Sequence, residues 1–188
     1  MRGKKGFSYA RKFEDSSDVI IDEYSHQGFQ RKINDTLVEL SEKQQKGISN
    51  SLNSVMYFTF LPYFLQDKAV KMNYVGQNKI KGKEYHQVQV TFAQNGGGDD
   101  FEDEYRYWFN VSDSTMDYLA YSYKVNGGGI RFREAYNTKY IEGIRFSDYK
   151  NYEVELNTPL DSIPSLFNQG KLGLLSTIAN EEIIVFAK

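Results

Sequence analysis

The alternation of apolar and polar positions along the chain predicts a protein made mostly of antiparallel β-strands. Residues 83–92 alternate regularly, so that Val88, Val90 and Phe92 fall on one face of an extended strand. Aromatic and β-branched residues, which strands favour, are frequent in the same kind of segment. The pattern predicts further strands at residues 6–14, 18–24, 28–33, 70–76, 104–111, 117–125, 129–138, 140–149 and 181–186.

One segment breaks the alternation and predicts the main helix, over residues 42–60. Ser41 and Gln44 have the spacing of a capping box, which satisfies the first free N–H groups of a helix. Apolar residues then recur at helical spacing, at Ile48, Leu52, Val55, Met56 and Phe60. Pro62 ends the helix, and residues 58–65, the most apolar segment, are expected to form a short lid.

Many antiparallel strands with one amphipathic helix predict an α+β fold that is mostly β. A flat sheet would expose its aromatic faces and its open edges to water. We therefore expect one strongly curved antiparallel sheet, a half-barrel, with the helix and the short lid on its concave face. No domain boundary is visible, so residues 1–188 are expected to form a single half-barrel domain. The chain enters a strand pattern already at Gly6, so we expect an N-terminally trimmed sequence without its targeting signal.

Two glycine triplets, at residues 96–98 and 127–129, predict loops between neighbouring strands. Glycine adopts positive φ at little steric cost, which suits the ends of hairpins. We expect at least one residue of each triplet to lie at positive φ.

Composition excludes several classes of function. The formal net charge is −2, so no overall field attracts nucleic acid, which we do not expect as a partner. The chain has no cysteine, which excludes disulfides and thiolate zinc sites. Aromatic residues make up 15% of the chain, and its 15 tyrosines suit pocket walls because each combines an apolar ring with a polar tip.

Four aromatic residues are the candidate walls of a ligand-binding cavity: Tyr57, Phe60, Phe64 and Trp108. Three of them lie in or beside the apolar 58–65 segment, which would cover the cavity. Aromatic walls with a few polar tips are typical of ligand pockets. The alternative is an ordinary hydrophobic core.

Arg131 and Arg133 are two residues apart on a predicted strand and therefore point to one face. Clustered guanidinium groups bind carboxylate or phosphate, so this pair is a candidate site for an anionic headgroup. The alternative is a ladder of ion pairs with Glu134, Glu142 or Asp148.

No motif predicts catalysis, a metal site or a cofactor. The acidic run at residues 99–104 lacks the ligand spacing of an EF-hand, and an exposed loop explains it better. His26 and His86 are the only histidines, and neither a cysteine nor a Gly-x-Ser-x-Gly elbow accompanies them. We expect no catalytic residue, no metal ligand and no cofactor.

A set of short motifs is spread over residues 6–180. It includes Asn53-Ser54-Val55-Met56-Tyr57-Phe58, Leu61-Pro62-Tyr63, Gly96-Gly97-Gly98-Asp99-Asp100, Tyr107-Trp108, Arg131-Phe132-Arg133-Glu134-Ala135 and Gly143-Ile144-Arg145-Phe146-Ser147-Asp148-Tyr149. In these motifs the chain resembles a family of uncharacterised bacterial envelope proteins, often predicted lipoproteins. More distantly, its strand order and its helix with a proline lid resemble the Lol-type lipoprotein-carrier half-barrels, which hold acyl chains in an apolar cavity. The resemblance implies a periplasmic or outer-membrane lipoprotein, anchored to the membrane in a longer form.

These observations together predict a non-catalytic protein that binds or carries an apolar, lipid-like ligand in the bacterial cell envelope. Two alternatives remain open. Carboxylates such as Asp67, Asp99 and Asp117 are abundant enough for a carboxylate- or metal-dependent hydrolase. An open sheet edge would suit a structural or interaction protein. The sequence sets no oligomeric state.

Overall fold

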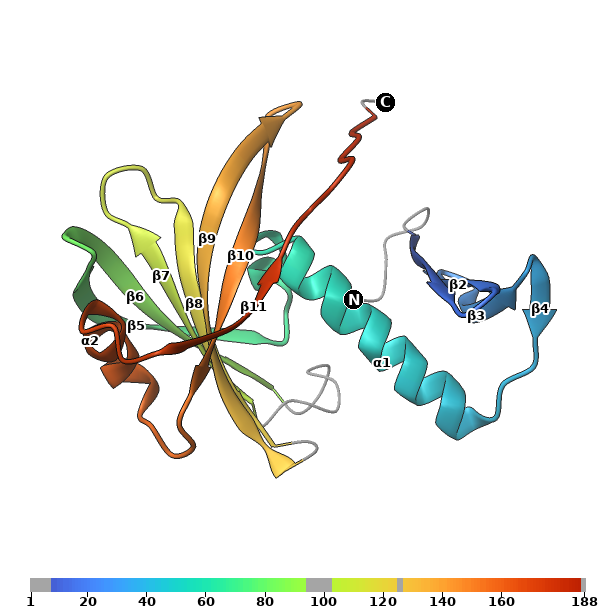
Figure 1. Ribbon diagram of the computed structural model, residues 1–188, viewed down its shortest axis with the longest axis horizontal. Helices are drawn as coiled ribbons and strands as arrows, with labels where there is room; N and C mark the ends of the chain where they lie inside the picture. Colours follow the sequence, from blue (N-terminus) through green and yellow to red (C-terminus); the bar gives the residue numbers. More distant parts are fainter. Residues whose placement is uncertain (1–7, 94–102, 125–126, 187–188) are drawn as a thin grey trace. The chain divides into compact units, whose positions relative to one another are not determined.

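The chain divides into two compact units, each with an antiparallel sheet of its own (Figure 1). The computed structural model describes residues 8–93, 103–124 and 127–186. The first unit ends at Asp67 and the second begins at Lys68.

The first unit is a four-stranded meander followed by a long helix. Its strands are β1 (Tyr9–Asp15), β2 (Asp18–Ser25), β3 (Gly28–Ile33) and β4 (Thr36–Val38), hydrogen-bonded in that order. Asn34 and Asp35, both at positive φ, form the turn into β4, a conformation that these two residue types tolerate. The helix α1 (Glu42–Thr59) and the short 3₁₀ turn η1 (Tyr63–Gln66) complete the unit.

The helix α1 begins with the capping box that the sequence predicts. The Ser41 hydroxyl accepts from the Gln44 N–H at 3.4 Å, and the Gln44 side chain accepts from the Ser41 N–H at 3.1 Å. The helix packs against β1, β2 and β3. Leu52 is its fully buried residue, so only a narrow apolar stripe holds it.

A buried ion cluster joins the strands of this small sheet to α1. The carboxylate of Asp22 on β2 is fully buried and accepts from Arg31 Nε at 2.6 Å and from Arg11 Nη2 at 2.7 Å. Arg11 also donates to the Ser51 hydroxyl on α1 at 3.1 Å. Burial alone would raise the pKa of Asp22, but the hydrogen bonds and charges of the two arginines outweigh burial and lower it.

The second unit is a seven-stranded antiparallel sheet. The strands are β5 (Val70–Ile80), β6 (Lys83–Phe92), β7 (Glu104–Asn110), β8 (Met116–Tyr123), β9 (Gly129–Ile141), β10 (Ile144–Val154) and β11 (Gly173–Ile178). Each pairs with its neighbours in sequence, in the order β11-β10-β9-β8-β7-β6-β5. A 3₁₀ turn η3 (Leu160–Ser162) and the short helix α2 (Ile163–Asn168) connect β10 to β11.

An aromatic core fills one face of this sheet, beneath α2. Phe167 of α2 lies 4.9 Å from Phe132 of β9, and Phe132 lies 5.8 Å from Trp108 of β7, measured between ring centroids. The side chain of Asn168 fixes the end of α2, because it accepts from the Lys81 N–H at 2.9 Å and donates to the Lys79 carbonyl at 2.8 Å. The core therefore depends on a helix of only six residues.

The structure confirms a mostly-β α+β fold with antiparallel strands, but the strands form two sheets and not the one that we expected. The predicted main helix exists as α1 and packs on the four-stranded sheet, whereas α2 covers the aromatic face of the larger one. The reason is positional: α1 separates β4 from β5, so the chain of neighbouring hairpins is interrupted there. The predicted strand over residues 181–186 is wrong, since those residues lie outside any strand and β11 ends at Ile178.

The second glycine triplet behaves as predicted. Gly127 and Gly128 have φ of 88° and 77° in the loop between β8 and β9. The first triplet and most of the acidic run lie outside the described residues.

Candidate functional site

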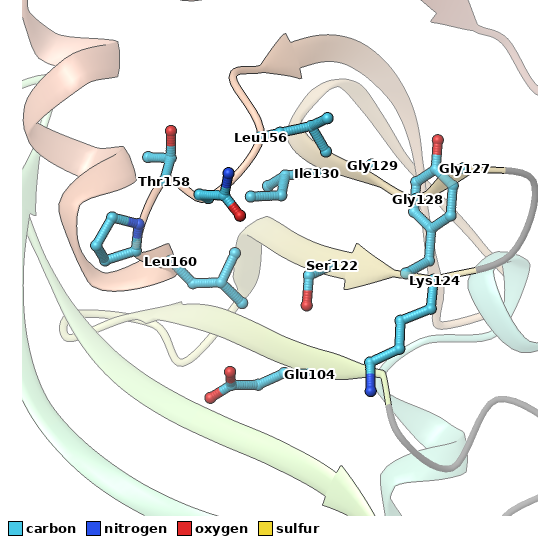
Figure 2. Close-up of a pocket in the computed structure, with 13 residues that line it drawn as sticks. Glu104, Ser122, Lys124, Gly127, Gly128, Gly129, Ile130, Leu156, Thr158 and Leu160 are labelled. Carbon is cyan, nitrogen blue, oxygen red and sulfur yellow. The ribbon is translucent and has the colours of Figure 1, made fainter.

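A cavity of about 460 Å³ lies in the second unit, at one end of the seven-stranded sheet (Figure 2). The start of β7, the end of β8 and the start of β9 meet there, because neighbouring strands are antiparallel. The segment of residues 156–160 between β10 and α2 forms the opposite side. We call this space the β7–β9 cavity.

One wall of the β7–β9 cavity is apolar. It consists of Ile130 from β9 and of Leu156, Pro159 and Leu160 from the connecting segment. Ile130 and Leu160 also belong to the aromatic core, so the wall continues directly into the hydrophobic interior. Leu156 is 56% exposed, which leaves an apolar side chain at the mouth of the cavity.

The side formed by β7 and β8 is polar and contains Glu104 and Ser122, and Thr158 adds a hydroxyl group from the connecting segment. Figure 2 shows Glu104, Ser122 and Leu160 pointing toward the same space from β7, β8 and the connecting segment. Arg106 Nη1 and Gln89 Nε2 both donate to Glu104 Oε1 at 2.7 Å. The carboxylate is thus held in one orientation before any ligand arrives.

Arg106 also fixes the segment that covers the cavity. Its Nε donates at 2.7 Å to Asp161 of η3, which accepts a second hydrogen bond from Gln87 on β6. Burial alone would lower the pKa of Arg106, but its hydrogen bonds to Asp161 and Glu104 raise it. The guanidinium group is therefore a permanent cation that ties η3 to the sheet.

Tyr123 lies at the edge of the cavity, next to the glycine loop. Its ring lies across Gly129, its direct partner on β9, and fills the space that a Cβ at Gly129 would occupy. The guanidinium of Arg131 lies 5.5 Å from the centroid of the Tyr123 ring. The absence of a Cβ at Gly129 leaves the space that the end of this ring occupies.

The structure brings three of the predicted ligand-binding residues together, in the first unit. Tyr57 of α1 stacks on Phe64 of η1 with ring centroids 5.8 Å apart, and Phe60 lies 6.0 Å from Phe64. Trp108 belongs to the second unit, where it is fully buried and donates from Nε1 to Asn78 Oδ1 at 3.1 Å. None of these four residues lines the β7–β9 cavity.

Arg131 and Arg133 lie on the face of the sheet opposite the aromatic core. Side chains alternate along β9, and Phe132 between them points into the core. Arg133 donates to the Tyr121 hydroxyl at 3.1 Å, with its guanidinium 5.4 Å from the ring centroid. Two of the acids considered as their partners bind other groups: Glu134 pairs with Lys81, and Asp148 accepts from Asn137. Arg131 and Arg133 thus each contact a tyrosine of β8.

Three further observations concern metal binding, membrane crossing and the histidines. Within the parts of the chain that the structure describes, no group of three or more His, Asp or Glu side chains is placed to hold a metal ion. In those same parts, no helix combines the length and apolar character needed to cross a membrane. His86 on β6 contacts the ring of Tyr74 at 5.8 Å between centroids.

Sequence reasoning missed the β7–β9 cavity, because its walls come from segments far apart in the chain. The glycine loop at residues 127–129 was the one part of the site that the sequence indicated, because a hairpin there places Ser122 opposite Ile130. The sequence around residues 156–160 does not predict that this segment packs against the same end of the sheet.

Comparison with known proteins identifies a family. No curated protein and no solved structure matches the chain. The model of a family of unknown function, DUF6503, matches residues 19–180. That range takes in β3 to β11 and most of β2, including every residue that lines the β7–β9 cavity. The chain therefore belongs to the DUF6503 family.

Proposed function

We propose that this protein is a non-catalytic binder or carrier of an apolar, lipid-like ligand in the bacterial cell envelope. The observation that carries the proposal is the β7–β9 cavity, with an apolar wall that continues into the core. Its volume of about 460 Å³ lies within the range of roughly 300–1,000 Å³ that is usual for small-molecule sites.

The energetics favour an apolar ligand. Burying about 200 Å² of apolar ligand surface contributes about 5 kcal/mol at ~25 cal/mol per Å², before the cost of association is subtracted. The exposed Leu156 at the mouth gains contacts when a ligand covers it. A hydrocarbon chain entering beside Ile130 and Leu160 replaces water along the apolar wall.

In this proposal the seven-stranded sheet acts as the half-barrel of a lipoprotein-carrier-like fold, with the 156–160 segment over its cavity. The resemblance of the chain's motifs to envelope proteins supports the location. The aromatic cluster of Tyr57, Phe60 and Phe64 would then be a second apolar surface for the same kind of ligand.

One observation favours a second candidate function, recruitment of a partner protein. The edge strand β5 carries three exposed apolar side chains, Met72, Tyr74 and Val75. An edge of this kind can accept an additional strand from another chain. A discrete oligomer or complex without a bound lipid would favour this alternative.

The test uses the neutral fluorescent probe N-phenyl-1-naphthylamine, which brightens in apolar sites. We expect micromolar binding to the whole chain and about tenfold weaker binding to Leu156→Arg, because an arginine at the mouth opposes an apolar ligand. Leu175→Arg on β11 is the matched control, since Leu175 is 50% exposed and lies outside the cavity. Failure of the probe to bind, or equal loss in both variants, contradicts the proposal.

A further inference from the structure

The polar wall of the β7–β9 cavity presents a carboxylate whose orientation is already fixed. Glu104 Oε1 accepts from both Arg106 and Gln89, whereas no described residue donates a hydrogen bond to its second oxygen. The side chain of Glu104 is 39% exposed and lines the cavity. A fixed and accessible carboxylate oxygen accepts hydrogen bonds and cannot donate them.

The nearest fixed cation is already neutralised. Arg106 is 8% exposed, and its Nε and Nη1 donate to Asp161 and Glu104. Two carboxylates flank this one guanidinium, so the three side chains carry a net negative charge. The other charged residue that lines the cavity is Lys124, an exposed side chain on a long flexible stem.

The arginine pair that the sequence offered for an anionic headgroup does not line this wall. Arg131 and Arg133 contact Tyr123 and Tyr121 on the opposite face of the sheet. A carboxylate or phosphate entering the cavity would therefore lie beside Glu104, where like charges repel each other.

We infer that the β7–β9 cavity takes an amphipathic ligand whose polar end donates hydrogen bonds, an ammonium or a hydroxyl group, in preference to a carboxylate or phosphate. This inference rests on the proposed function, whose site it makes more specific. The apolar chain of the ligand contacts Ile130, Leu156 and Leu160, and its polar end donates to the free oxygen of Glu104. Ser122, the strand partner of Glu104, supplies a hydroxyl group next to it, and Thr158 supplies another from the connecting segment.

The test displaces N-phenyl-1-naphthylamine with three ligands of one chain length: dodecylamine, dodecanol and dodecanoate. We expect dodecylamine to bind at least about tenfold more tightly than dodecanoate, with dodecanol between them. Glu104→Gln should weaken dodecylamine about tenfold and leave dodecanol unchanged. The amide oxygen stays with Arg106 and Gln89, and the amide NH₂ that then faces the cavity donates to a hydroxyl group but cannot accept from an ammonium. The matched control is Glu153→Gln, which removes one exposed carboxylate from β10 outside the cavity and should change none of the three.

The outcomes separate this inference from the proposed function. If the probe binds and dodecanoate displaces it as well as dodecylamine does, the headgroup preference is wrong and lipid binding stands. The same conclusion follows if Glu104→Gln leaves the ratio of amine to acid unchanged. If the probe does not bind at all, the proposed function itself fails. The urea midpoint of each variant, followed by Trp108 fluorescence, shows whether the second unit is still folded.

Discussion

The four-stranded sheet of the first unit contains a buried carboxylate held by two arginines, whereas the seven-stranded sheet of the second unit carries an aromatic core on one face. In the first, Asp22 is fully buried, and the buried apolar side chains of β1 to β4 are Tyr9 and Ile20. In the second, Phe132 contacts both Trp108 on β7 and Phe167 on α2. A small sheet cannot bury enough apolar surface on its own, so directional charge pairs supplement it. The larger sheet buries enough apolar surface on its aromatic face to remain stable with a cavity at one end.

The substitution with the largest expected effect disrupts the aromatic core. Phe132→Ala removes a fully buried ring that contacts both Trp108 and Phe167, so we expect a loss of about 3–5 kcal/mol in the free energy of unfolding. Trp108 is the single tryptophan, so its fluorescence during urea denaturation reports this unit alone. Phe186→Ala, at a side chain that is 85% exposed, serves as the control. A loss below about 1 kcal/mol would show that α2 does not depend on this ring.

The substitution with the next largest expected effect disrupts the ion cluster of the first unit. Asp22→Asn leaves Arg11 and Arg31 without their anion, and both guanidinium groups are only partly exposed. We expect a loss of about 2–3 kcal/mol, below the usual 3–5 for a buried pair because the arginines can reach water. Hydrogen exchange of β1 to β3 measures it, with Asp35→Asn in an exposed turn as the control. Unchanged protection of these strands would mean that the cluster is dispensable.

The two sheets should lose stability at opposite ends of the pH scale. The lowered pKa of Asp22 gives the first unit stability that is complete above the unfolded value of about 4 and is lost as pH falls through the folded value. Burial and the Asp117 carboxylate raise the pKa of Tyr85 to about 12, and burial and Glu134 raise the pKa of Tyr152 to about 12. Those two tyrosines stabilise the second unit below about pH 10, and their contribution is lost between about pH 10 and 12.

Hydrogen exchange at acidic pH and Trp108 fluorescence at alkaline pH measure the two losses separately. We expect Asp22→Asn to remove the acid sensitivity of β1 to β3, and Tyr152→Phe to reduce the alkaline sensitivity of the Trp108 signal. Unfolding of both sheets at the same extreme of pH would contradict the comparison.

The smallest expected effect is on the wall of the cavity. In Gly129→Ala the new methyl group overlaps the end of the Tyr123 ring, which can rotate away because it is the far end of a side chain. We expect a change below about 1 kcal/mol in the free energy of unfolding, together with severalfold weaker binding of N-phenyl-1-naphthylamine. Gly170→Ala is no suitable control, since Gly170 has φ of 67°, whereas Gly47→Ala adds a methyl group to α1 in open space. Unaltered probe binding in Gly129→Ala would remove Tyr123 from the site.

Local patterns predicted the local structure. The alternation in residues 83–92 gave a strand, Ser41 and Gln44 gave the start of α1, and the glycines at 127–128 gave a loop at positive φ. Each of these depends on the conformational preferences of a few neighbouring residues. The assignment of strands to two sheets does not, because antiparallel alternation looks the same whichever strands pair.

The site depends on long-range contacts, and for that reason the sequence could not locate it. Arg106 reaches Asp161 over 55 residues of chain, and that contact brings the 156–160 segment over Glu104 and Ile130. Trp108 has an aromatic character that suits a pocket wall as well as a core, and only the register of β7 places it in the core. Arg131 and Arg133 do share one face, as their spacing predicts, but that spacing does not say which face the core occupies.

The central claim is that the β7–β9 cavity holds the ligand, and backbone amide chemical shifts during titration with dodecanol test it most directly. We expect the largest shifts at Ser122, Gly128, Ile130 and Leu160, with no change at Ile20 in the small sheet. Shifts confined to β5 around Met72 and Tyr74, or to the Tyr57–Phe64 cluster, would contradict the claim by placing the ligand elsewhere.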